Sequence, residues 1–349
     1  MARKTTRRQF LKQAAVTGVG IYGAAMLPVE LRAAESDKSR IVVINSPNVL
    51  VDAGANKNTV AKLGMVSVGE ADASVDQAVL NSMIAKGMQS FTGAKSEADA
   101  WKKLFKPSDV VGIKVNCLFA KGASTRPEVV AGIIAGLKSA GVKEENIIVW
   151  DRNDREMIRA GFVINRSGTG VAVYGTESEY EAEPTKIGAF NGRLSKILTE
   201  KITALINAPV LKDHSMSGVT CAMKNHFGSH ANPGDHHPNN CDPAMAELNS
   251  APAIRNKTRL IICDALRPLA NGGPGLRPEF LWDYRTILIS ADPVAMDYQG
   301  WQIIEERRKE IGLKPLADGG RPTKFISTAA SLGLGTNDPA KMDIIRKTV

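Results

Sequence analysis

The sequence predicts an α/β fold, in which a mainly parallel, mixed sheet carries helices on both faces. Short apolar runs rich in Val and Ile recur along the chain, as at residues 40–46 and 109–117, and such runs form buried strands. Amphipathic segments of helical period lie between several of these runs. The order strand, helix, strand over residues 109–151 has the length of a right-handed crossover unit, which makes its two strands parallel.

In the first half of the chain, cap and turn residues divide the elements. Ser96 is placed to cap a helix that has acidic residues in its first turn, and Thr125 to cap another whose first turn holds Pro127. Gly93 and Gly141 are the matching stop signals. The elements predicted are a strand at 40–46, helices at 75–90 and 96–105, a strand at 109–117, a helix at 127–140 and a strand at 146–151.

The second half is less regular, although buried strands recur in it. Asn191-Gly192 predicts a hairpin turn within residues 187–198, and Asp242 is placed to cap a helix that runs through Leu248. Asp292-Pro293 opens a long helix that ends near Ile311. The remaining predictions are strands at 171–174, 202–211, 259–265 and 286–290, and a helix at 218–227.

The N-terminal residues predict export. Thr6-Arg7-Arg8-Gln9-Phe10-Leu11-Lys12 matches the full twin-arginine pattern, and a moderately apolar run follows at 14–29. Three glycines and Pro28 interrupt this run, which is too short for a stable transmembrane span. We therefore assign residues 1–34 to a twin-arginine signal peptide and 35–349 to the mature α/β domain. The twin-arginine translocase is then a partner during export, and the periplasm is the expected location. An uncleaved anchor is the alternative.

Charge and cysteine content exclude two classes of protein. Six of the 45 basic and one of the 36 acidic residues lie in the first 34, which leaves 39 basic and 35 acidic residues and a net charge of +4. No basic run follows, so we expect no nucleic-acid binding. Four cysteines without a Cys-x-x-Cys pair are too few for a disulfide scaffold. One or two disulfides remain an alternative to buried thiols.

Residues 213–242 contain all five histidines and two of the four cysteines. His226 and His230 are four apart, a separation at which two imidazoles on a helix can bind one metal, and His236-His237 follow a Pro233-Gly234 turn. Histidine favours zinc, iron or nickel over magnesium or calcium. We predict a transition-metal site formed by His226, His230, His236 and His237. The alternative is an exposed loop with one or two buried, hydrogen-bonded histidines.

Polar residues follow several of the predicted strands. In an open parallel sheet, ligands bind outside the carboxyl ends of the strands, so these residues predict one cleft beneath the histidine-rich segment. Lysine and arginine beside a helix N-terminus at 218–220 would suit a carboxylate or phosphate. The catalytic candidates are Lys224, His226 and Lys212, and the substrate or anion-binding candidates are Lys114, Asn116, Arg126, Asn225 and Asp264.

The same residues carry a resemblance to a family. Lys114-x-Asn116, the segment 125–130 (TRPEVV), Asp151, Asn207-x-Pro209-x-x-Lys212, the segment 220–228 (TCAMKNHFG), Asp264, Gly273-Pro274-Gly275 and the segment 292–297 (DPVAMD) follow one another as in the DUF362 family, a domain of unknown function. The resemblance covers roughly residues 105–300. Some members carry a ferredoxin-like iron–sulfur module, but this chain has no Cys-x-x-Cys-x-x-Cys run.

A fainter resemblance links Thr125-Arg126-Pro127 and the spacing from Lys224 to the histidines with the nickel-pincer lactate racemase family. It implies that Lys224 would match a cofactor-attaching lysine and His236 or His237 a nickel ligand. From all these features we predict an exported enzyme that acts on a small anionic substrate in a His/Lys-lined cleft, with a bound metal or metallo-cofactor. The alternative is a non-catalytic periplasmic protein that binds a metal or an anion.

Overall fold

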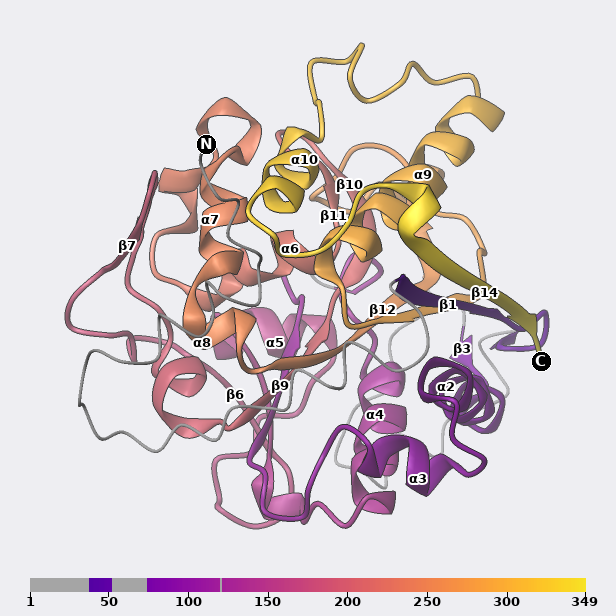
Figure 1. Cartoon of the computed structure of the whole chain (residues 1–349), viewed down its shortest axis with the longest axis vertical. Coiled ribbons are helices and arrows are strands. Elements are labelled where there is room, and N and C mark those ends of the chain that lie inside the picture. Colours follow the sequence, from indigo (N-terminus) through magenta and orange to yellow (C-terminus); the bar gives the residue numbers. More distant parts are fainter. Residues whose placement is uncertain (1–37, 52–73, 120) are drawn as a thin grey trace, which may run out of the picture. The chain divides into compact units, whose positions relative to one another are not determined.

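Residues 38–51, 74–119 and 121–349, the part of the chain that this computed structural model describes, build a ten-stranded mixed sheet with helices on both faces (Figure 1). The predicted signal peptide lies outside the described residues. Eight strands follow one another across the sheet in the order β14-β1-β13-β12-β9-β4-β5-β6. Their bounds are β1 Ser39–Asn45, β4 Val111–Val115, β5 Ile147–Asp151, β6 Ala172–Gly175, β9 Ala204–Ala208, β12 Thr258–Leu269, β13 Thr286–Ser290 and β14 Met342–Thr348.

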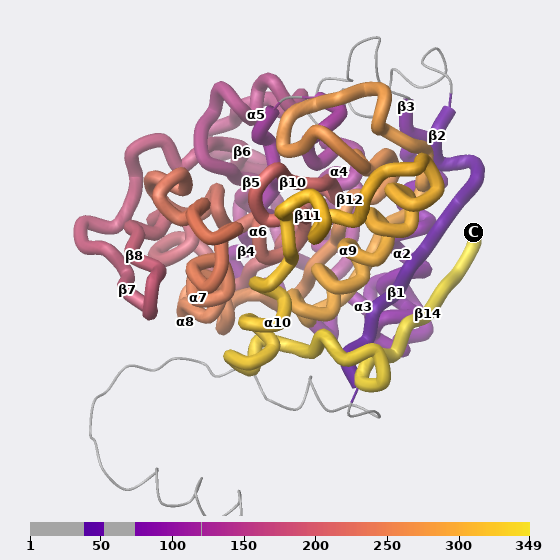
Figure 2. The backbone as a smooth tube through the Cα atoms, turned by 90° about the horizontal axis from the view of Figure 1, so that it is seen from above, coloured from indigo at the N-terminus to yellow at the C-terminus, as the bar shows by residue number. Residues whose placement is uncertain are grey.

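The pairing confirms the predicted fold class. Strands β12, β9, β4, β5 and β6 run parallel, as the crossover from β4 through helix α4 to β5 requires. Strand β13 is antiparallel to both of its neighbours, β1 and β12, which makes the sheet mixed. Strands β1 and β14, from opposite ends of the chain, pair side by side at one edge (Figures 1 and 2).

Two apolar layers hold the helices to the sheet. Successive side chains of a strand point to opposite faces, so Ile287 and Ile289 of β13 join one layer and Leu288 joins the other. The first layer packs under α2 (Gln77–Thr92), α3 (Glu97–Lys102), α4 (Pro127–Ser139) and α5 (Asp154–Ala160). The second packs under α6 (Ala222–Asn225), α7 (Ala244–Ser250), α8 (Pro252–Arg255), α9 (Pro293–Glu310) and α10 (Lys324–Ser331). Among the described helices, none is long and apolar enough to cross a membrane.

The sheet divides at Pro209. Residues 202–211 were predicted as one strand, but Pro209 has no N–H to donate and separates β9 from β10 (Val210–His214). Before the proline, β9 pairs with both β4 and β12. After it, β10 pairs with β12 and with the short strand β11 (Gly218–Thr220), and no longer with β4. The strand order also reverses between β4 and β9, which is where such sheets bind ligands.

Two further local predictions were wrong because distant residues decide the structure. The hairpin of β7 (Thr185–Ile187) and β8 (Phe190–Gly192) turns at Gly188, whose φ is 58°, and not at Asn191-Gly192. The Glu247 carboxylate accepts hydrogen bonds from the N–H groups that follow this turn. Residues 218–220 form β11, so the predicted helix at 218–227 shrinks to α6.

Some of the predicted helix caps form in the structure and others do not. Ser96 caps α3 and Gly93 ends α2 in the left-handed conformation, as predicted. Thr125 does not cap α4, because its hydroxyl donates to the Ala208 carbonyl 2.7 Å away and so joins the α4 start to β9. Asp242 likewise makes no side-chain cap on α7, which begins after Pro243.

Candidate functional site

Buried polar side chains gather at the carboxyl ends of the parallel strands, as predicted. Lys114 and Asn116 lie at the end of β4, Asp151 ends β5, and Asn207 lies near the end of β9. Hydrogen bonds link residues from these strands to one another and to α6, so they form one site. Most of them are less than 5% exposed, so each buried charge needs a partner or shifts its protonation.

Lys114 forms a buried ion pair. Its Nζ lies 2.6 Å from Asp151 Oδ1 and 2.6 Å from the Val115 carbonyl, and the other Asp151 oxygen accepts from the Cys117 N–H. A β-carbon at Gly228 would lie 2.4 Å from Asp151 Oδ1 and 2.7 Å from Lys114 Nζ. Only glycine therefore fits above this pair. The charge of Lys114, predicted to bind substrate, is neutralised within the protein.

His226 belongs to a buried amide network. Asn225 Nδ2 donates to Asn207 Oδ1 at 2.7 Å and to the Lys114 carbonyl at 3.1 Å. Asn207 Nδ2 lies 3.4 Å from His226 Nε2, and His226 Nδ1 lies 3.0 Å from Ser229 Oγ. Burial lowers the pKa of His226 to about 3, so the ring is neutral near pH 7. Both ring nitrogens have partners, which leaves neither for the predicted roles as acid/base or metal ligand.

Arg126 and Asp264 contact each other. Asp264 Oδ2 accepts from the Arg126 backbone N–H at 2.9 Å, and the guanidinium lies 3.2 Å from Oδ1. The carboxylate thus lies at the N-terminus of α4, where the helix dipole favours negative charge. Both residues were predicted to bind an anionic substrate. In the structure, the Asp264 carboxylate of the protein itself is the anion at the start of α4.

Lys212 is buried among neutral oxygens. Its Nζ donates to the Ala123 carbonyl at 2.6 Å, to Asn116 Oδ1 at 3.2 Å and to the Leu118 carbonyl at 3.3 Å. These bonds use all three donors and hold the loop between β4 and α4. Burial lowers the pKa of Lys212 to about 8. Lys212 therefore supplies a positive field and fixes a loop, and it has no free donor for the catalytic role predicted.

Lys224 is the centre of a cluster of rings. Its Nζ lies 3.1 Å from His237 Nε2 and 3.6 Å from the centre of the Phe227 ring. His237 in turn stacks on His214, with ring centres 5.6 Å apart and planes 18° from parallel. Burial lowers the pKa of Lys224 to about 7, which is near the operating range of an acid/base catalyst.

Hydrogen bonds fix the proton arrangement of this cluster. His237 Nδ1 lies 2.9 Å from the Pro233 carbonyl, which can only accept, so Nδ1 carries a proton and Nε2 of the neutral ring accepts from Lys224. Nδ1 of His214 accepts from the Met216 and Ser217 N–H groups. Burial, then the Lys224 and His237 charges, lower the pKa of His214 to about 2. His214 therefore stays neutral, and Lys224 and His237 share the exchangeable proton.

The predicted four-histidine metal site is not formed. His230 and His236 lie against Phe190, with their ring centres 5.0 Å apart, while His226 and His237 have both nitrogens in other hydrogen bonds. Among the ring nitrogens of these four described histidines, only His230 Nε2 and His236 Nδ1 lack a hydrogen-bond partner. No group of three His, Cys, Asp or Glu side chains in that part of the chain could hold a metal ion. This histidine set therefore does not fit a metal ion.

All four cysteines are free and buried in the structure. Sequence reasoning missed Asp297, whose carboxylate accepts from the Ala222 and Met223 N–H groups at the start of α6 and so orients Lys224. Burial raises the pKa of Asp297 to about 7. The sequence feature that could have indicated this residue is its position as the last aspartate of the segment 292–297 (DPVAMD).

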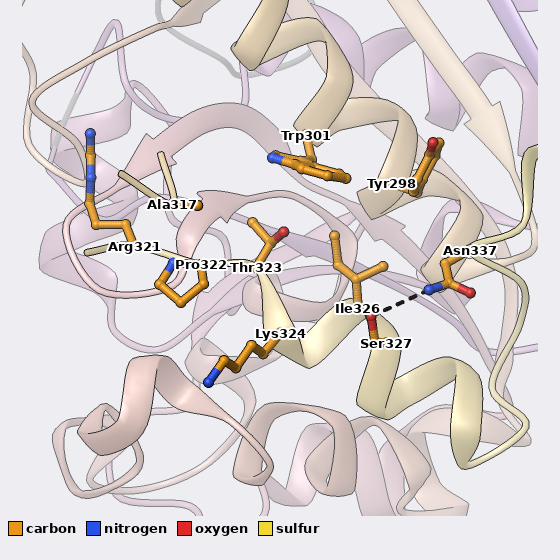
Figure 3. A pocket seen from close by; sticks show the side chains of 10 residues that line it. All are labelled: Tyr298, Trp301, Ala317, Arg321, Pro322, Thr323, Lys324, Ile326, Ser327 and Asn337. Carbon is orange, nitrogen blue, oxygen red and sulfur yellow. Dashed lines mark hydrogen bonds between the residues drawn. The ribbon is translucent and has the colours of Figure 1, made fainter. Parts of the chain in front are cut away.

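A pocket of about 270 Å³ lies between α9 and α10, lined by Tyr298 and Trp301 on one side and Thr323 and Ile326 on the other (Figure 3). It shares one residue with the site. Arg321 lines its end and forms an ion pair with Asp213, at 2.7 Å, and the other Asp213 oxygen accepts from the Gly273 N–H. Asp213 lies between Lys212 and His214 on β10, so the pocket wall is joined to the site.

The sequence of the site is that of a known family. The family described as "Domain of unknown function (DUF362)" matches residues 111–302, which include every site residue above except Arg321. The chain belongs to the DUF362 family. No curated protein matches it.

Two solved structures are similar to this DUF362 chain. One is the crystal structure of a protein from Thermotoga maritima, with 10% identity and a TM-score of 0.42, over 68% of this chain and 60% of the other. The second is the lactate racemase apoprotein from Thermoanaerobacterium thermosaccharolyticum, with 12% identity and a TM-score of 0.38, over 65% of this chain and 55% of the other. The chain thus spans less than two thirds of the length of either.

Proposed function

We propose that this DUF362 protein is an exported enzyme that acts on a small anionic substrate, with Lys224 and His237 moving the proton. The hydrogen bond between Lys224 Nζ and His237 Nε2 carries the proposal. A fully buried lysine usually has a carboxylate partner, but among the described residues Lys224 has only an imidazole and an aromatic ring. A lysine in such surroundings titrates near neutral pH and can both accept and donate a proton.

An anionic substrate would supply the missing negative charge. Lys212 and Lys224 are both buried cations without a carboxylate partner in the described part of the chain, and each lowers the pKa of His214. Their combined field favours an anion beside them. His237 is only half-buried, so its ring gives a substrate access to the pair. With Lys224 neutral, the amine accepts a proton from the bound substrate, and the resulting ammonium then donates a proton to the product, which restores the neutral amine.

Turnover and binding are tested separately. We would titrate the purified protein with acetate, lactate and inorganic phosphate by calorimetry, and follow a panel of hydroxy acids and phosphoesters by NMR. Lys224→Met should abolish turnover of any substrate found, whereas Lys143→Met, an exposed lysine, should leave it unchanged. Anion binding without turnover of any compound would instead favour a periplasmic binding protein. Failure to bind any anion would overturn the proposal.

The metal is tested on the same sample. Elemental analysis with an absorption spectrum should show no stoichiometric zinc, iron or nickel, because the described histidines do not form a ligand set. A tightly bound metal that disappears in His237→Asn would contradict the assignment of His237 to Lys224. Nickel is the ion to measure first, because segments of the sequence resemble the nickel-pincer lactate racemase family.

Export is proposed from residues 6–12, which lie outside the described residues. Replacing both Arg7 and Arg8 by Lys should keep the protein in the cytoplasmic fraction and leave residues 1–34 uncleaved. Fractionation with mass determination of the periplasmic form measures both. Unchanged export of the double variant would contradict the twin-arginine route.

A further inference from the structure

Exposed apolar side chains concentrate at the loops around the site. In the part of the chain that the structure describes, eight large apolar side chains are exposed, and four of them lie on three loops at this edge of the sheet. Their exposed fractions are 36% for Leu118, 48% for Phe119, 38% for Met216 and 36% for Leu276. Exposed apolar residues that gather at one place mark a binding surface, whereas scattered ones need no explanation.

The loops that carry these side chains are held by residues of the site itself. The Leu118 carbonyl accepts from Lys212 Nζ, and the Met216 N–H donates to His214 Nδ1. Leu276 lies three residues after Gly273, whose N–H donates to Asp213 Oδ1 at 2.7 Å. The three residues 212–214 of β10 thus each bind a backbone group of one of the three loops, which joins the loops that carry the apolar side chains to the buried Lys212.

Two of the loops fit closely together. A β-carbon at Gly122 would lie 3.1 Å from Leu276 Cδ1, and one at Gly275 would lie 3.9 Å from Phe119 Cδ1. Phe119 itself has a φ of 73°, a conformation that a bulky residue rarely adopts because it is strained. An aromatic side chain held half-exposed at such a position points to a functional reason for keeping it.

Resting on the proposed function, we propose that the substrate is a small amphiphilic anion, whose carboxylate or phosphate lies near Lys224 and whose apolar group lies on Leu118, Phe119, Met216 and Leu276. The buried cations would bind the charged group of the substrate. The four exposed apolar side chains, here called the apolar rim, would bind its apolar group. A fully hydrophilic anion would leave this rim in water. The rim also fits the need to exclude water from the Lys224–His237 pair.

A series of straight-chain carboxylates from acetate to octanoate tests the inference by calorimetry. Each added methylene should tighten binding roughly two- to fourfold until the rim is covered. Phe119→Ser and Leu276→Ser should flatten this dependence while keeping the affinity for acetate. Ile158→Ser and Val163→Ser remove exposed apolar side chains elsewhere and should leave it unchanged. Urea midpoints and circular dichroism check that each variant is folded.

The outcomes separate the inference from the proposed function. If acetate binds, and binding is lost in Lys224→Met, but chain length has no effect, the inference fails and the proposed function survives. If neither inorganic phosphate nor a carboxylate of any length binds, both fail. If the wild type self-associates and Phe119→Ser does not, the rim covers a second copy of the chain, which also overturns the inference.

Discussion

Two kinds of buried cation lie at the carboxyl ends of the parallel strands. Lys114 and Arg126 each contact a buried carboxylate, Asp151 at 2.6 Å and Asp264 at 3.2 Å. Lys212 and Lys224 are also buried, but their partners among the described residues are carbonyl oxygens, an amide oxygen, an imidazole and an aromatic ring. The charges of Lys114 and Arg126 are therefore neutralised by carboxylates within the fold. Lys212 and Lys224 instead leave positive charge in the protein interior, where an unpaired charge is energetically costly.

This difference separates a structural role from a functional one. Removing one partner of a buried ion pair strongly destabilises a protein, because the other charge is left unpaired. A buried lysine without a carboxylate partner, in contrast, already destabilises the fold that contains it. Groups with strongly shifted pKa values cluster at functional sites, and Lys224 and Lys212 show such shifts, to about 7 and about 8. We therefore expect substitutions in the first pair to change stability, and those at Lys224 to change function.

The largest effect is expected for Asp151→Asn. The variant leaves the Lys114 ammonium buried without its carboxylate, which should lower the free energy of unfolding by about 3–5 kcal/mol. Urea unfolding of the wild type and the variant measures it. The matched control is Glu144→Gln, which breaks the exposed Lys138–Glu144 pair and should change stability by less than about 1 kcal/mol. Equal effects for the two variants would remove the distinction between the pairs.

An opposite sign is expected for Lys224→Met. Removing a buried charge that lacks a carboxylate partner among the described residues should raise the free energy of unfolding, on the order of 1–4 kcal/mol, while abolishing the proposed activity. Methionine fills a similar volume beside Phe227. Thermal and urea unfolding at pH 6.5, where Lys224 is mainly protonated, measure the gain. A loss of more than about 1 kcal/mol would show that Lys224 is a structural residue like Lys114.

Sequence patterns predicted the regular parts of this molecule well. Local signals such as Ser96 and Gly93 decide helix ends by themselves, because their partners are a few residues away. The gathering of strand-end residues was also predictable, since it follows from parallel pairing alone. The pattern even placed Lys224 and the histidines in one region.

The chemistry of the site depended on long-range contacts that no local pattern shows. The start of α6 is set by Asp297, 75 residues from Ala222, and residues 218–220 are drawn into a strand by β10. Histidine spacing suggested a metal, but spacing does not fix where a ring points. Pro233 O and Lys224 take the two nitrogens of His237, and Asn207 and Ser229 those of His226. The same residue types therefore make hydrogen bonds instead of a metal site.

The smallest effect, and the one that tests the comparison most directly, is on pH dependence. Lys224 has a folded-state pKa of about 7, below its ordinary value of 10.5, so between these values the unfolded state binds more protons than the folded state. Stability should therefore rise with pH from 7 to 8.5, by at most about 1.4 kcal/mol per pH unit from this group. Above that window, buried Cys and Tyr side chains oppose the rise, because burial raises their pKa values.

Lys224→Met should reduce this slope, and Lys86→Met, an exposed lysine on α2, should not. Lys224 also lowers the pKa values of His214 and His237, but both lie below 6.5, so the difference between wild type and Lys224→Met above pH 7 comes mainly from the Lys224 amine. Urea midpoints at half-unit pH steps supply the measurement. If the slope is unchanged in Lys224→Met, the amine keeps its ordinary pKa in the fold. The proton shared with His237 would then not be available near neutral pH, and the contrast with Lys114 would be one of contacts alone.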